Sequence, residues 1–342
     1  MNSCVKNGKN GIITTVALNS SFLLLLLFFP FLLRADHLAV RGSVAGFYNS
    51  NIEHLSIIDF LTVGKQYGIF IRNEASAEYE YAFGETESFS FSLSLSSDTC
   101  LNSPERSRFN SFFELGWHGE PHDRLTLDLT LQAHHTAENY LQMRNMFLDL
   151  FVTGDLFWDI SDDHAAYATL KAGYYTGFDE DMRYMTGPAV GIELGYFYYP
   201  TAYTDYLKPG IGFEGYFFRP EILTSCTDTL RVNNSFIKPY LFLEGKIDFA
   251  PVFLKATLRY AYMEWLENDR FNEWSKRRRE HSPSVSTQVL WDMTKYFSMS
   301  LAYSYRHIFS NFGQSPSDYI DYTMEGHTVM LELSAAYERD TP

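Results

Sequence analysis

Residues Glu87 to Ser97 read ESFSFSLSLSS, and serine alternates strictly with a large apolar residue between Ser88 and Ser96. Successive side chains of a β-strand point to opposite faces, so this stretch predicts a strand with one apolar face and one hydroxyl-bearing face. A strand in a soluble β-sandwich would explain one such segment equally well. The pattern along the rest of the chain is needed to tell whether protein core or lipid covers the apolar face.

The same alternation recurs along most of the chain, which predicts an all-β fold. About fourteen strands, with twelve as the alternative count, are expected at 38–48, 67–83, 88–96, 108–118, 125–134, 146–159, 165–176, 188–199, 206–218, 235–249, 252–264, 285–292, 297–306 and 324–337.

The connections between these segments alternate in length. Short turns such as GETE (84–87) and SDDH (161–164) follow every second segment, and longer connections such as SDTCLNSPERS (97–107) and RPEILTSCTDTLRVNN (219–234) lie between them. Nothing in the architecture of a β-sandwich requires its long connections to lie at one end. A transmembrane β-barrel does, because short turns face one side of the membrane and longer loops the other.

Aromatic residues support the membrane interpretation. They make up 17% of the chain, and tyrosines and tryptophans fall near the ends of the apolar faces, where amphipathic rings suit the lipid headgroup level. The expected girdle residues are Trp117, Trp158, Tyr174, Tyr198, Tyr262, Trp291, Tyr303, Tyr305 and Tyr337.

In this combination of alternating strands, alternating loop lengths and aromatic girdles, residues 36–342 resemble bacterial outer-membrane β-barrel proteins. The count of about fourteen strands is similar to that of monomeric porins and fatty-acid transporters. The resemblance implies a transmembrane antiparallel barrel in the outer membrane, with both termini in the periplasm and long loops at the cell surface. It also implies contacts with outer-membrane lipids and with the barrel-assembly machinery. One departure is that Tyr337 is followed by ERDTP, whereas such chains usually end on an aromatic residue.

The N-terminus predicts export. Lys6 and Lys9 precede the apolar run SFLLLLLFFPFLL (21–33), and a small residue, Ala35, follows it, which is typical of a signal peptide spanning residues 1–35. A retained membrane helix is the alternative. The chain carries a formal net charge of −15, and an acidic exported protein is a poor candidate for binding nucleic acid.

If the apolar parity faces lipid, the opposite parity lines the lumen. Acidic residues are expected to do so on the early strands and basic residues on the later ones: Glu78, Glu80, Glu114, Asp128, Asp149 and Asp155, then Lys238, Lys246, Lys255, Arg259 and Arg306. Such segregation would create a transverse field that favours polar solutes over apolar ones. The alternative is that the charges pair locally and fill the barrel.

We therefore expect a channel for small hydrophilic solutes or ions with a mild preference for cations. One alternative is a fatty-acid-type transporter with an apolar interior, in which residues 36–66 could form a plug and the strand count would fall to thirteen. Another is a structural or adhesive surface barrel.

Catalytic, cofactor and metal sites are not expected. The motif GIGFEG (210–215) has the spacing of a dinucleotide fingerprint but lies inside an alternating strand, not before a helix. HGEPH (118–122) lacks the helix that would bring two metal-binding histidines together. The basic run SKRRRE (275–280) is expected on a solvated outer loop.

Two cysteines, Cys100 and Cys226, remain after removal of residues 1–35. Exported compartments permit disulfides, so a bond between two outer loops is expected, with two free thiols or a bond between molecules as the alternative.

Overall fold

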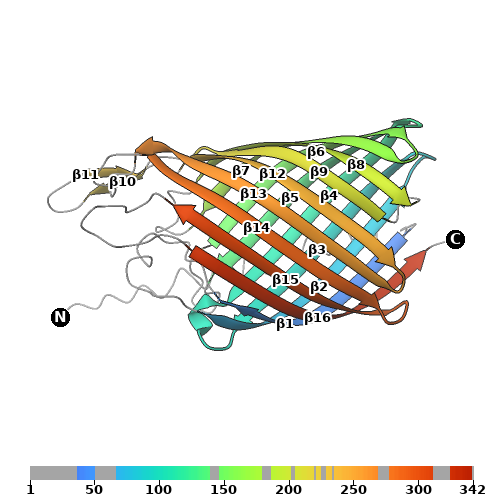
Figure 1. The fold of residues 1–342 in the computed structure, drawn as a ribbon, viewed down its shortest axis with the longest axis horizontal. Coiled ribbons are helices and arrows are strands. Elements are labelled where there is room, and N and C mark those ends of the chain that lie inside the picture. Colours follow the sequence, from blue (N-terminus) through green and yellow to red (C-terminus); the bar gives the residue numbers. More distant parts are fainter. Residues whose placement is uncertain are drawn as a thin grey trace.

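The computed structural model describes residues 37–50, 67–138, 146–178, 186–201, 205–218, 221–224, 229–232, 235–268, 277–310 and 324–340. Within these ranges, fourteen strands close into one antiparallel barrel and two further strands form a separate hairpin (Figure 1). The prediction of an antiparallel barrel of about fourteen strands is confirmed.

Barrel strands follow chain order around the wall, and the first strand pairs with the last. The first seven are β1 (His37–Asn49), β2 (Gly68–Ala82), β3 (Glu87–Cys100), β4 (Arg108–His122), β5 (Leu125–Glu138), β6 (Met146–Ser161) and β7 (His164–Gly177). The second seven are β8 (Gly187–Thr201), β9 (Asp205–Tyr216), β12 (Phe236–Phe249), β13 (Val252–Asn268), β14 (Arg277–Asp292), β15 (Phe297–Ser310) and β16 (Met324–Asp340).

The first and last strands, β1 and β16, close the barrel. They pair along thirteen residues of β1, from His37 opposite Asp340 to Asn49 opposite Thr328. Because β1 also pairs along its length with β2, residues 37–49 belong to the wall. The alternative in which 36–66 form a plug and thirteen strands remain is therefore wrong. β16 continues three residues past Tyr337, so the polar end of the chain extends the last strand to Asp340.

Two other expectations need correction. The connection between β9 and β12, expected to be one long loop, contains a small hairpin of β10 (Glu221–Thr224) and β11 (Thr229–Val232), which lies beyond the end of the barrel in Figure 1. β14 begins at Arg277, eight residues before the expected start, so part of the basic run lies in a strand and not in a loop.

The outer surface carries the apolar parity of every strand. Leu170 and Ile211 are both 61% exposed, and the ends of these faces carry exposed rings such as Trp158, Trp291 and Tyr337. Several outer tyrosines meet a histidine: the Tyr260 hydroxyl lies 2.6 Å from His281 Nδ1. An apolar band edged by amphipathic rings is what a bilayer requires of a barrel surface.

No helix in the described part of the chain is long and apolar enough to cross a membrane. Residues 1–35, where the signal peptide is expected, lie outside the described ranges.

Candidate functional site

The lumen is the candidate site, because the side chains opposite the exposed apolar parity gather there. On β3 the serines at 88, 90, 92, 94 and 96 take this inward parity, whereas Phe89 is 53% exposed on the outside. The expected lumen residues share the same parity on their own strands: Glu78, Glu80, Glu114, Asp128, Asp149, Asp155, Lys238, Lys246, Lys255, Arg259 and Arg306.

Strands β2 to β6 form an acidic part of the wall whose carboxylates are held mainly by neutral groups. Gln132 donates a 2.8 Å hydrogen bond to Glu114, and the Ser94 hydroxyl donates one of 3.1 Å to Glu74. Asp155 accepts a hydrogen bond from Thr169. In the described ranges, Glu74, Glu114 and Asp155 form no ion pair with a lysine or arginine. No ion pair therefore neutralises these three carboxylates directly, although Glu74 also interacts at longer range with Arg72.

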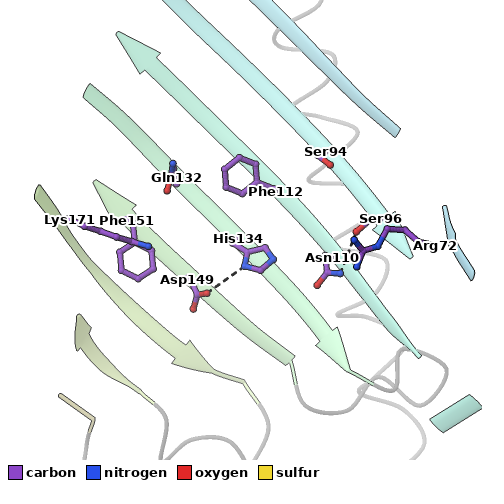
Figure 2. Close-up of a pocket in the computed structure, with 10 residues that line it drawn as sticks. All are labelled: Arg72, Ser94, Ser96, Asn110, Phe112, Gln132, His134, Asp149, Phe151 and Lys171. Atoms are coloured by element: carbon purple, nitrogen blue, oxygen red, sulfur yellow. Dashed lines mark hydrogen bonds and ion pairs between the residues drawn. The ribbon is translucent and has the colours of Figure 1, made fainter. Parts of the chain in front are cut away.

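Two histidines also lie next to carboxylates of this acidic wall. His118 Nδ1 lies 2.7 Å from Asp128, and His134 Nδ1 lies 3.6 Å from Asp149 (Figure 2). His118 comes from the motif HGEPH, and its partner Asp128 is the directly paired residue on the neighbouring strand. The described residues contain no group of three or more His, Cys, Asp or Glu that could hold a metal ion.

One arginine on this side is fully engaged at the end with the longer connections. Arg72 donates two hydrogen bonds to Asp98, of 2.6 Å from Nε and 2.9 Å from Nη2, and its guanidinium lies 5.4 Å from the ring centroid of Phe47. Bidentate pairs of this kind fix both partners and neutralise each other.

Strands β8 to β13 carry most of the basic residues of the lumen, and four of these five are paired locally, whereas the Lys246 ammonium lies 5.1 Å from the ring centroid of Phe253. Lys238 lies 2.8 Å from Glu214, Lys255 lies 3.0 Å from Glu244, and Lys208 lies 3.8 Å from Glu193. Arg259 also approaches Glu214, at 3.7 Å. Of the two alternatives for the lumen charges, local pairing describes this part of the wall. The wall is thus acidic on one side and close to neutral on the other.

Tyrosines join the same carboxylates. The hydroxyls of Tyr167 and Tyr240 donate hydrogen bonds of 2.6 and 2.7 Å to Glu193, and the Tyr206 hydroxyl donates one of 2.7 Å to Glu244. Each of these two carboxylates therefore links three side chains from the surrounding strands. Such fully paired networks hold their members in one arrangement.

Inward-facing glycines make room for these rings, which explains the first two of the three glycines of GIGFEG. A Cβ at Gly212 would collide with the ring of Tyr240, one at Gly210 with Phe242, and one at Gly195 with Tyr167. The bulky ring on one strand therefore lies flat across the bare backbone of its neighbour. The motif serves packing inside the barrel.

Aromatic rings line β6 to β13 on the inside, and sequence reasoning missed them. They form an inner contact network at the end with the short turns, where the ring of Phe197 lies 5.4 to 6.3 Å from its neighbours Phe157, Tyr167, Tyr199 and Tyr206. The sequence did contain a signal for these inner rings, because stretches such as YLFLEGKIDF (240–249) carry bulky residues on both faces of the strand.

A cavity of about 450 Å³ opens on the inner wall between β2 and β7. It is lined by Arg72, Ser94, Ser96, Asn110, Phe112, Gln132, His134, Asp149, Phe151 and Lys171 (Figure 2). The Lys171 ammonium lies 3.8 Å from the ring centroid of Phe151. Hydroxyls, amides and charged groups next to two rings suit a hydrated, partly apolar solute.

The expected disulfide is not present at Cys100. This residue, expected in a long loop, ends β3, is 1% exposed and packs against Phe70. Cys100 forms no disulfide with any described residue, and its Sγ lies 3.4 Å from Asn102 Oδ1. Cys226 lies outside the described residues.

No family model and no curated protein matches this chain. Solved structures with a similar fold include a FadL homologue from Pseudomonas aeruginosa, which is 10% identical over 89% of each chain with a TM-score of 0.46. The outer membrane channel DcaP of Acinetobacter baumannii is 7% identical over 88% of this chain and 97% of its own, with a TM-score of 0.45. Salmonella typhi OmpF in complex with daunomycin is 10% identical over 88% and 97%, with a TM-score of 0.47.

Proposed function

We propose that this chain is an outer-membrane channel through which small hydrophilic solutes and ions pass passively, with a preference for cations. The apolar outer surface with its aromatic edges supports a place in a membrane, and the position of the start of β1 and the end of β16 beside the short turns supports periplasmic termini. A barrel of this strand number is wide enough to hydrate charged side chains.

The observation that carries the proposal is the uneven pairing of lumen charges. Glu74, Glu114 and Asp155 rest on hydroxyl and amide donors, whereas Lys208, Lys238 and Lys255 each face a glutamate. Uncompensated carboxylates attract cations and repel anions over about a Debye length, which is roughly 10 Å at 0.1 M salt. A cation passing along β2 to β6 therefore meets a favourable field.

Planar-bilayer recording of detergent-refolded protein tests the proposal. In a KCl gradient we expect steady conductance steps and a reversal potential of the sign that cation selectivity produces. The double variant Glu114→Gln and Asp155→Asn removes two lumen charges and should move the reversal potential toward zero.

A matched control removes the same charge elsewhere. Asp123→Asn and Asp163→Asn lie in the turns after β4 and β6, outside the lumen wall, and should leave the reversal potential nearly unchanged. A silent bilayer, with the protein shown to be inserted, would instead favour a blocked structural barrel. Equal shifts in both double variants would show that overall charge, and not the acidic wall, sets the selectivity.

A further inference from the structure

A second cluster of lumen rings lies at the end of the barrel with the longer connections. This mouth cluster lies on the inward parity of five strands or next to them, and consists of Phe147, Tyr175, Tyr216, Phe218, Phe236 and Trp265. Its rings form one chain of contacts, with centroid distances of 5.5 Å for Phe147 to Tyr175, 5.7 Å for Tyr175 to Phe218, 6.3 Å for Phe218 to Phe236, 4.8 Å for Tyr216 to Phe236 and 5.8 Å for Phe236 to Trp265.

Two rings of the mouth cluster are buried and four are partly exposed. Phe147 and Phe218 are 4% and 6% exposed, whereas Tyr175, Tyr216, Phe236 and Trp265 are only half-buried. Ring surface thus remains available to a molecule that enters the barrel from this end. Partly open aromatic surface in a hydrated lumen favours solutes that have an apolar or cationic face.

Carboxylates lie level with these rings or one step deeper in the lumen. Asp149 on β6 is in register with Tyr175 on β7, and Glu214 precedes Tyr216 by two residues on β9. The Oδ2 atom of Asp149 lies 3.6 Å from His134, while Oδ1 is buried and has no hydrogen-bond partner in the described part of the chain. Asp149 therefore acts on a cation near the rings through its negative charge and not through a free acceptor atom.

Rings on this side of the lumen already hold cationic groups of the protein itself. The Lys208 ammonium lies 4.2 Å from the ring centroid of Tyr167 and 5.1 Å from that of Phe197, and the Arg259 guanidinium lies 3.9 Å from that of Tyr240. These distances are within the range of cation–π attraction. The mouth cluster combines the same ring types with a nearby carboxylate.

We propose that the mouth cluster binds organic ammonium cations that carry an aromatic ring, before they pass into the lumen. The ring of the solute packs against Phe236 and Trp265, and its ammonium group lies over the next ring of the cluster in the direction of Asp149. The inference rests on the proposed cation passage and specifies one class of solute for it.

Calorimetric titration of the refolded, detergent-solubilised protein with phenyltrimethylammonium tests the site directly. We expect saturable binding that Phe236→Leu weakens by roughly three- to thirtyfold, the range expected for loss of one cation–π and stacking partner. Asp149→Asn should weaken binding as well. Benzenesulfonate has the same ring with the opposite charge and should bind much more weakly.

Phe309→Leu is the matched control, because Phe309 is 50% exposed on the outer surface of β15 at the same end of the barrel. It should leave binding unchanged. Heat-modifiable gel migration verifies that each variant folds, and Trp265→Leu is the second ring variant if Phe236→Leu does not fold. Equal binding by Phe236→Leu and Phe309→Leu, or equal binding of benzenesulfonate, would overturn the inference.

Bilayer current separates this inference from the proposed function. If potassium current is cation-selective but phenyltrimethylammonium does not bind, the channel stands and the mouth site fails. If phenyltrimethylammonium binds in a Phe236-dependent manner but no current flows, the site stands and the transport proposal fails.

Discussion

Tyr240 on β12 donates its 2.7 Å hydrogen bond to Glu193 on β8 across the whole width of β9. The two residues are 47 positions apart in the chain, and the strand between them carries Gly212 where the ring crosses. One glycine therefore permits a contact between two strands that are not neighbours.

Gly212→Ala should push the Tyr240 ring aside and break its bond to Glu193. The added methyl group would collide with the far end of the ring, which has to move, so we expect a loss of about 1–3 kcal/mol in the free energy of unfolding. Urea titration of the refolded protein in lipid vesicles measures this loss. Gly245→Ala is the control, because its Cβ would meet only ordinary contacts at 3.7 and 3.8 Å. Equal losses in both variants would contradict the proposed ring displacement.

Lysine substitutions on β3 should distinguish its two faces. Leu93 shares the outer parity of Phe89, and Ser92 shares the inner parity of Ser94. Leu93→Lys places a charge in lipid near the middle of the strand and should cost about 2–4 kcal/mol of stability in vesicles. Ser92→Lys places the same group in the hydrated lumen beside Glu114 and Glu78, its paired residues, and should cost little. The reverse order would mean that the faces are assigned the wrong way round.

Cys100 should react slowly with a maleimide in the folded barrel. Its side chain is 1% exposed, and its backbone N–H donates a 3.0 Å hydrogen bond to the buried Ser107 hydroxyl, so reagent reaches it only after local opening. We expect rapid labelling in urea and slow labelling after refolding, measured on a Cys226→Ser variant of the chain without residues 1–35. The chain without residues 1–35 and with Cys226 intact, digested without reduction, should yield Cys100 as a free-thiol peptide in mass spectrometry. A peptide that links Cys100 to Cys226 would contradict the structure.

The sequence by itself determined the barrel strands, their faces and the two classes of connection, but not the β10–β11 hairpin or the early start of β14. Residues such as Phe89, Leu93 and Ser92 report the period of two directly, because the direction of a side chain along a strand depends only on its own backbone. The alternation of short and long connections then implied antiparallel neighbours and a closed wall. The lumen parity of Glu114 and Lys238 followed from the same local rule.

Only the tertiary structure decided which inward side chains meet. The pairing of Lys238 with Glu214, the crossing of Gly212 by Tyr240 and the mouth cluster of rings all depend on the register between strands and on closure of β1 against β16. The same is true of Cys100, which the end of β3 buries against Phe70 on β2. Register is a property of strand pairs, and a shift of two residues would keep every side chain on its face while replacing every partner, so the alternation within one strand carries no information about it.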